Sequence, residues 1–425
     1  MPPQPPPEPF RRRAVRSALR RVDAMFSARG PGFRQLSMSW AANVAGDTLV
    51  AIALAGTLFF DVPTADAREK VALYLGITLA PFAVIAPVLG GLFNRFPVYR
   101  AAITLSCLAR AVVAVVMMTG LDSLWLFPLA FTMLVLSRLY GISKNSMLPV
   151  ALDEPTALVS ANARLARIGI YAGGVVLPLG AGLAQLTPVL PLLLAAAFFL
   201  FSGFLGLGLP DPGEAPEERS PGAPTPVARP AREPVPLLAP GAARFVRLAR
   251  LATAGVRLIN GYLILLLAFA FREGGQGALD FGVLVTAAGA GYGIASFVSP
   301  WLERRLREEP MVVAALALEA GAAFMAAQGF SVASAASLAG AAGIAWGLAK
   351  FGFDGLLQRS IVPGRRGQAF TRAETLFQLA WVVGAIIPVM ITVDAEFGMT
   401  VAGIAALIAQ TVFVAALLVE PERGV

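Results

Sequence analysis

The segment PDPGEAPEERSPGAPTPVARPAREPVPLLAPGAAR, residues 210–244, is the one long polar, proline-rich stretch in the interior of an otherwise apolar chain. Its mixture of Pro, Gly, Ala, Arg and Glu cannot bury enough apolar surface to form a packed core. We therefore expect an extended or disordered linker that tethers and does no chemistry. It divides the chain into two apolar halves.

The composition on either side of this linker predicts a membrane protein. Hydrophobic residues make up 57% of the 425 residues and charged residues only 14%, which is too little polar surface for a water-soluble fold. A bilayer core of ~30 Å needs ~20 apolar residues per helix. Twelve such runs occur, six on each side of the linker: 36–60, 69–93, 99–120, 123–145, 160–186, 188–209, 247–271, 278–302, 311–330, 332–356, 368–392 and 398–419.

The runs are apolar on every side, as in LLLAAAFFLFSGFLGLGL at 192–209, and lack the alternation of a transmembrane β-strand. The predicted fold class is an all-α membrane protein with twelve transmembrane helices. Its expected parts are a Pro/Arg-rich tail (1–35), a first six-helix bundle (36–209), the linker (210–244), a second bundle (245–419) and a short tail (420–425). The lone cysteine, Cys107, excludes an intramolecular disulfide and is expected to pack in the core.

Arginine and lysine gather in the N-terminal tail and in alternate loops, a set that includes Arg95, Arg100, Lys144, Arg304 and Arg365. This asymmetry predicts that both termini and the linker are cytoplasmic. It also explains the net charge of +8 without a nucleic-acid partner. The preference for Arg over Lys, with three lysines in all, indicates a GC-rich bacterial genome and hence a bacterial plasma membrane.

The two halves resemble each other at an offset of 210 residues, which matches Arg95 to Arg305, Gly174 to Gly384 and Pro178 to Pro388. Because each half has an even number of helices, both repeats keep the same orientation in the membrane. The relation is therefore a parallel one, with its axis along the membrane normal.

Across residues 36–419 the chain resembles the major facilitator superfamily of secondary transporters. Its G-x-L-x-D-R-x-G-R-R signature is matched by Gly90, Leu92 and Arg95, with Asn94 in place of the Asp and Pro97 in place of the second Gly. In the family this loop is a cytoplasmic latch. Asn94 carries no charge, so we expect the latch to be weaker here.

The resemblance also ranks charged residues inside the membrane, which are expensive and usually functional. It implies that the first, fourth, seventh and tenth helices line a central cavity. These helices carry Asp47, Arg138, Arg257 and the pair Lys350 and Asp354. Arg110 and Glu319 lie on helices that are peripheral in the family, so we expect them to stabilise the bundles.

Asp47 is the residue we expect to couple transport to protons, opposed by Arg257 across the cavity. The chain has no histidine, so proton coupling must use carboxylates. The alternative is that Asp47 only pairs helices. For Lys350, Asp354 and Glu374 a gate or a loop-facing position is as plausible as a transport role. Polar and aromatic candidates for the cavity wall are Asn43, Asn260, Tyr262, Trp346, Gln378 and Trp381, which could equally pack between helices.

The sequence thus predicts a monomeric carrier that moves a small organic solute by alternating access, without a cofactor, with the lipid bilayer and protons as its other partners. The first-helix acid and the Gly- and Pro-rich fifth helix resemble the exporters of the family. The alternatives are an importer of the same fold and a transport-inactive sensor or assembly protein. An enzyme is disfavoured because the chain has no histidine, no metal-ligand cluster and no G-x-S-x-G or H-E-x-x-H motif.

Overall fold

The computed structural model describes residues 25–26, 30–58, 98–121, 125–152, 158–187, 189–210, 242–273, 278–305, 308–361 and 365–418. The expected helix at 69–93, the latch residues Gly90, Asn94 and Arg95, and most of the two tails and the linker lie outside these residues. Eleven helices occupy the described residues: α2 (Pro31–Leu58), α4 (Tyr99–Met117), α5 (Leu126–Ala151), α6 (Leu158–Leu186), α7 (Val189–Leu207), α8 (Ala242–Glu273), α9 (Ala278–Glu303), α10 (Glu308–Ala326), α11 (Val332–Ser360), α12 (Arg366–Met390) and α13 (Ala395–Leu418).

The structure confirms the all-α membrane class. Eight of the described helices are long and apolar enough to cross a bilayer. The count of twelve stays a prediction. Helix ends differ from the apolar runs by several residues, because strong helix formers extend a helix beyond its apolar part. The Ala-Ala-Arg at 242–244, for example, already belongs to α8 and not to the linker.

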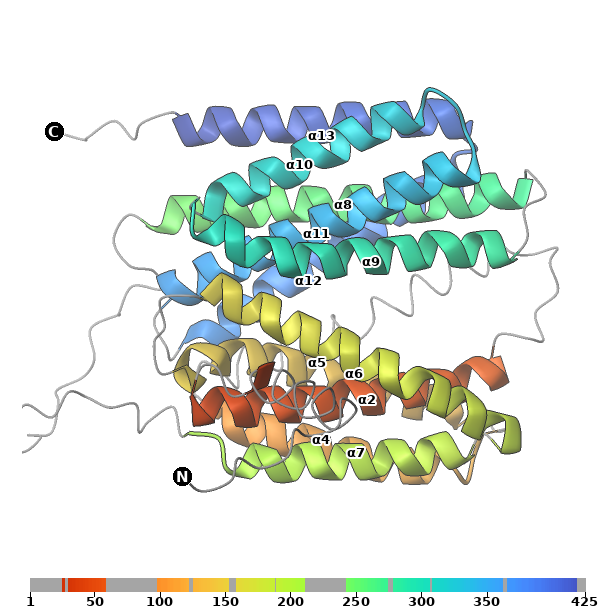
Figure 1. Ribbon diagram of the computed structural model, residues 1–425, viewed down its shortest axis with the longest axis vertical. Helices are drawn as coiled ribbons and strands as arrows, with labels where there is room; N and C mark the ends of the chain where they lie inside the picture. Colours follow the sequence, from red (N-terminus) through yellow and green to blue (C-terminus); the bar gives the residue numbers. More distant parts are fainter. Residues whose placement is uncertain are drawn as a thin grey trace, which may run out of the picture.

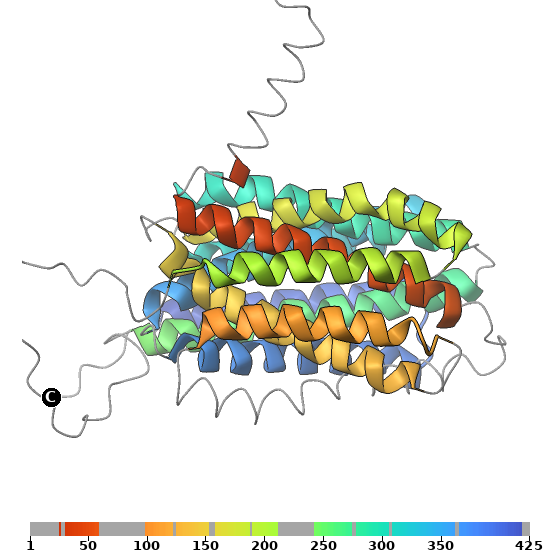
Figure 2. The same cartoon turned by 90° about the horizontal axis from the view of Figure 1, so that it is seen from below.

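The described helices form two groups, which are shown in Figure 1 with α8 to α13 above and α2 to α7 below. Equivalent helices pack in equivalent pairs: α2 on α6 as α8 on α12, α4 on α5 as α10 on α11, and α4 on α7 as α10 on α13. Seen from below in Figure 2, α2, α7 and α4 lie side by side on the face turned away from the second half. Helices α5 and α6 lie on the other side, toward α9, α11 and α12.

Glycines let two helix pairs of the second half cross at backbone contact. A Cβ at Gly384 of α12 would overlap the carbonyl oxygen of Leu258 in α8, and one at Gly343 of α11 would overlap that of Ala288 in α9. Small residues allow this close approach of helices. The equivalent position in the first half is looser, because a Cβ at Gly174 of α6 would have no atom of another element within 4 Å.

The two halves meet at one end of the bundle, which we call the linker end because α7 ends and α8 begins there. The starts of α4, α6 and α12 and the ends of α5, α9 and α11 lie at the same end. A shared hydrophobic core joins the halves at this end. Its buried residues include Tyr99, Leu148 and Leu158 from the first half and Phe353 and Phe370 from the second.

Candidate functional site

A charged cavity of about 300 Å³ lies between the two halves. Helices α2, α5 and α6 line it from the first half, and α9, α11 and α12 from the second. Its wall carries three basic side chains and three acidic ones, together with polar and aromatic groups. The charged side chains are Arg138, Lys144, Lys350, Asp47, Asp354 and Glu374.

On the first-half side, Asp47 joins the cavity to a buried network. Its carboxylate forms an ion pair with Arg110 of α4, and it accepts hydrogen bonds from Asn43 at 3.2 Å and Ser137 at 3.4 Å. The Asp47 side chain is 36% exposed, whereas that of Arg110 is fully buried. Asp47 therefore presents one edge to the cavity while its other edge binds a cation inside the bundle.

This geometry corrects the expectation that Asp47 faces Arg257. Arg110, which we expected only to stabilise the bundle, lies on α4 in the same half and supplies the cation that pairs with Asp47. The Arg110 guanidinium also donates to Asn43 at 2.6 Å and lies 4.0 Å from the centre of the Phe199 ring. Asn43 is buried in this network and does not line the cavity, contrary to expectation.

On the second-half side, Lys350 holds two carboxylates. Its ammonium lies 2.7 and 2.9 Å from the two oxygens of Asp354, one helical turn away, and 3.6 Å from Glu374 of α12. All three side chains line the cavity. The structure thus brings together residues expected at a gate, and places them in the wall of the central cavity.

Lys144 was assigned to a loop by the sequence analysis, and the structure places it inside α5. Lys144 is the last residue but one of the apolar run 123–145 and was counted with the adjoining loop, but the helix continues to Ala151. The Lys144 ammonium lies 3.9 Å from the centre of the Trp40 ring and lines the cavity. Its spacing of three residues from Gly141 and seven from Ser137, both also in the cavity wall, is the helical-face signal that reveals it.

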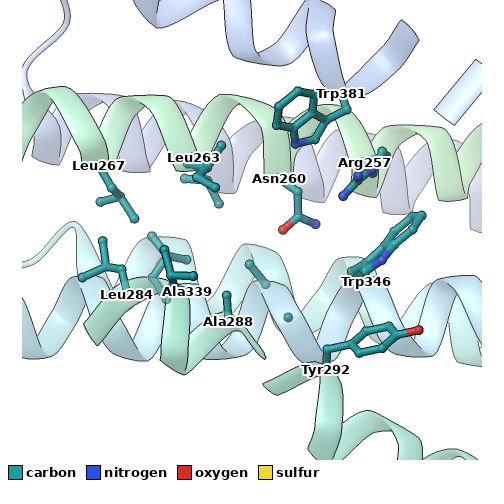
Figure 3. Close-up of a pocket in the computed structure, with 15 residues that line it drawn as sticks. Arg257, Asn260, Leu263, Leu267, Leu284, Ala288, Tyr292, Ala339, Trp346 and Trp381 are labelled. Atoms are coloured by element: carbon teal, nitrogen blue, oxygen red, sulfur yellow. The ribbon is translucent and has the colours of Figure 1, made fainter. Parts of the chain in front are cut away.

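Beside the central cavity, a second cavity of about 190 Å³ lies within the second half between α8, α9, α11 and α12. We call it the side pocket; Figure 3 shows its lining residues. Trp346 and Tyr292 line both cavities. The Arg257 guanidinium lies over the Trp346 ring at 4.6 Å and over the Trp381 ring at 5.7 Å.

The other candidates for the cavity wall divide between the side pocket and the helix core. Asn260 lines the side pocket, although its amide donates to the Val256 carbonyl at 3.0 Å. Tyr262 and Gln378 are buried and line neither cavity, which corrects their assignment. Glu319 is fully buried in α10, and among the described residues its carboxyl oxygens have no hydrogen-bond partner.

At the linker end, Glu303 at the last turn of α9 binds the first turn of α6 in the opposite half. Its carboxylate accepts the backbone N–H groups of Val159 at 3.1 Å and Ser160 at 2.8 Å, and also the Ser160 hydroxyl. A carboxylate at a helix N-terminus satisfies otherwise unpaired donors and meets the positive end of the helix dipole. A hydropathy pattern assigns a charged residue at the end of a helix to the adjoining loop, so the sequence did not predict this contact.

Two further hydrogen-bonded contacts join the halves nearby. Gln358 of α11 accepts from Asn162 and donates to the Asn145 carbonyl, both at 2.8 Å. The Tyr99 hydroxyl accepts the backbone N–H of Gly367 at 3.1 Å. Since Asn145 and Asn162 also line the central cavity, these contacts close the cavity at the linker end.

Replacing Glu303 with alanine is expected to favour separation of the halves at this end. Losing charge-assisted bonds to helix-terminal donors costs about 2 kcal/mol, which is roughly a 30-fold change in the open-to-closed ratio. The separation can be measured by double electron–electron resonance between spin labels at Ala101 and Arg305, which are both exposed. Cys107 is replaced by serine so that it takes no label. We expect a new long-distance population in the variant.

The control is Glu396→Ala. Glu396 also accepts a backbone N–H, that of Phe330 at 3.1 Å, but the two residues belong to the same half. The control should leave the distance distribution unchanged. Identical distributions in the Glu303 variant and the parent protein would show that this carboxylate does not hold the halves together.

Three transporters of known structure have a similar arrangement of helices. The human organic anion transporter MFSD10 matches with a TM-score of 0.67 and 16% identity, covering 89% of this chain and 98% of its own. A bacterial homologue of the iron transporter ferroportin in an outward-facing state matches with a TM-score of 0.64 and 19% identity, covering 90% and 98%. The major facilitator superfamily transporter FucP in the outward conformation matches with a TM-score of 0.62 and 14% identity, covering 90% and 97%. The chain therefore has the fold of the major facilitator superfamily transporters.

Sequence relatives carry no named activity. An uncharacterized protein of Mycobacterium leprae is 28% identical over an aligned length of 407 residues, and the match covers 87% of this chain and 68% of that protein. Uncharacterized proteins from two strains of Mycobacterium tuberculosis are 37% identical over an aligned length of 150 residues, with coverage of 33% of this chain and 27% of their own length. No protein-family model matches the chain.

Proposed function

We propose that this protein is a secondary transporter that moves a small organic solute across the plasma membrane by alternating access. The observation that carries the proposal is the charged cavity between the halves, which draws side chains from both halves and is closed at the linker end by contacts between them. A site of this kind changes its exposure when two rigid halves rock about it. The transport fold of the structural neighbours supports the same reading.

We further propose that the linker end is cytoplasmic and that transport is export in exchange for protons. The distribution of arginines supports this orientation, in which the described conformation is closed toward the cytoplasm. Asp47 supports proton exchange, because its carboxylate is in reach of the cavity while bound to Arg110. Protonation of Asp47 would break its ion pair with Arg110 and leave the Arg110 guanidinium without an anion. Proton binding and solute binding would then be coupled through this one ion pair.

One transporter fold serves chemically different solutes. The named substrates of two structural neighbours, organic anions and iron, are chemically unlike. An importer would use the same cavity with the opposite gradient. A transport-inactive sensor would show no solute-dependent proton movement and no change of solute accumulation on deletion.

Asp47→Asn is expected to abolish uptake driven by a pH gradient while preserving exchange of solute for solute. Asparagine keeps an oxygen that accepts from Arg110, so the fold survives, but it binds no proton. Inverted vesicles with an imposed acid-inside gradient, tested with a panel of radiolabelled organic solutes, measure both activities. Asp394→Asn, a change at an exposed carboxylate that accepts local backbone hydrogen bonds at the opposite end, is the control. Unchanged uptake and pH dependence in Asp47→Asn would remove Asp47 from the coupling mechanism.

A further inference from the structure

The side pocket has two chemically different ends. At one end lie Arg257, Asn260, Trp346 and Trp381, and at the other Leu267 and its apolar neighbours, as Figure 3 shows. Arg257 and Leu267 are ten residues apart on α8, so the pocket is about 15 Å long at a rise of ~1.5 Å per residue. A ligand that matches this wall has one polar end and an elongated apolar body.

The polar end of the pocket holds a cation that lacks an anion. Among the described residues Arg257 forms no ion pair or hydrogen bond, and its contacts are with the rings of Trp346 and Trp381. Glu374 attracts Arg257 electrostatically, but the ion pair of Glu374 is with Lys350 at 3.6 Å. Arg257 differs in this respect from Arg110, whose donors bind Asp47 and Asn43.

The two indole rings leave the Arg257 donors available. An aromatic ring that contacts a guanidinium engages its flat face, whereas the N–H donors point outward in its plane. Guanidinium donors in a water-poor site bind carboxylate, sulfonate and phosphate groups through paired, charge-assisted hydrogen bonds. The cation at the end of this pocket therefore selects an anionic group.

The apolar end accounts for the rest of the ligand. Leu263, Leu267, Leu284 and Ala339 line it and offer no hydrogen-bonding side chain. Apolar contact stabilises a bound group in proportion to the surface removed from water. Because Trp346 and Tyr292 border both cavities, a molecule in the side pocket keeps its anionic end next to the charges of the central cavity.

We propose that the side pocket binds an amphiphilic organic anion, with its carboxylate or sulfonate on Arg257 and its apolar body directed toward Leu267. This inference rests on the proposed function, since it names the class of solute that is carried. The same chemistry occurs in free solutes and in anionic lipids. We assign the pocket to a free solute, because its volume of about 190 Å³ suits a single short apolar group.

The test uses the full-length protein in phosphatidylcholine nanodiscs and two probes of nearly equal shape, 4-butylbenzoate and the uncharged 4-butylbenzamide. Calorimetric titration is expected to give a dissociation constant about tenfold or more lower for the benzoate. Arg257→Gln should bring the two probes to similar affinity. Ala339→Leu, which fills the apolar end, should weaken 4-butylbenzoate and leave unsubstituted benzoate unchanged.

The matched control is Arg167→Gln. Arg167 also lies over an aromatic ring, that of Phe297 at 4.7 Å, but it lines neither cavity. The Arg167→Gln variant should bind both probes with the affinities of the parent protein. Equal affinity of the parent protein for benzoate and benzamide overturns the proposal even if Arg257→Gln does not fold. Loss of 4-butylbenzoate binding when phosphatidylglycerol is added to the nanodiscs would assign the pocket to an anionic lipid. That result would overturn its assignment to a free solute.

Uptake of radiolabelled 4-butylbenzoate into proteoliposomes separates this proposal from the proposed function. Selective binding without uptake supports the side pocket and contradicts transport of this solute class. Uptake of another solute by a protein that does not distinguish benzoate from benzamide supports transport and refutes the anion pocket.

Discussion

Asp47→Leu is expected to destabilise the protein by about 3–5 kcal/mol, the cost of leaving a buried charge without its partner. The Arg110 side chain is fully buried, and the loss of the carboxylate leaves it with Asn43, the Met133 sulfur and the Phe199 ring. None of these groups is charged. The free energy of unfolding, from denaturant titration in detergent, measures the effect.

The reverse change should cost less. Arg110→Leu leaves Asp47 with a side chain that is 36% exposed to the cavity, where water can solvate the carboxylate. In the double variant Asp47→Leu, Arg110→Leu both charges are gone, and leucines of similar volume fill the site. Replacement of a whole buried ion pair by apolar residues is often neutral, so most of the lost stability should return.

Asp394→Leu is the control, at an exposed carboxylate outside any ion pair of the described residues. It should cost only about 1 kcal/mol, because this carboxylate caps the first backbone N–H groups of α13. A double variant that loses the sum of the two single losses would show that the two charges do not interact. It would then follow that the stability of the first half does not depend on this ion pair.

Gly384→Ala is expected to reduce the yield of folded protein sharply, with a loss of stability of about 3 kcal/mol. The added methyl group would overlap the Leu258 carbonyl oxygen, and a backbone atom cannot rotate away as a side chain can. Alanine normally stabilises a helix by ~1 kcal/mol relative to glycine, which is less than the energetic cost of this overlap. The temperature at which the monodisperse chromatographic peak falls by half measures the loss.

Gly174→Ala is the matched control, because it lies in α6 with no atom within 4 Å of the added methyl group. There the helix propensity acts alone, and stability should stay equal or rise. Equal melting of the Gly384 and Gly174 variants would mean that α8 and α12 can move apart without loss, in conflict with a backbone contact at this crossing.

The elements of the fold were largely predictable from sequence. Long apolar runs predict helices because a lipid-embedded backbone must satisfy its own hydrogen bonds, and every described helix overlaps an expected run. The need of Asp47 for a partner, as a charge within an apolar run, could also be predicted. The choice of partner could not, since helical depth does not tell which neighbouring helix supplies the cation.

The site residues that were missed share a physical cause. Lys144 and Glu303 lie at the charged ends of apolar runs and were therefore assigned to loops, although they lie in α5 and α9. The side pocket depends on the backbone crossings at Gly343 and Gly384, which set the spacing of α8, α9, α11 and α12. Glycines in an apolar run indicate close packing, but not which helix approaches.

These backbone crossings bear on which parts of the molecule can move relative to each other. Two pairs of helices in the second half touch through main-chain atoms, and a main-chain contact has no rotamers with which to absorb a sliding motion. We therefore expect the second half to move as one unit. Relative movement should fall to the interface between the halves, where hydrogen-bonded side chains and a shared hydrophobic core make the contacts. Under the proposed mechanism, a molecule in the side pocket would keep a fixed orientation relative to the second half while the two halves move about it.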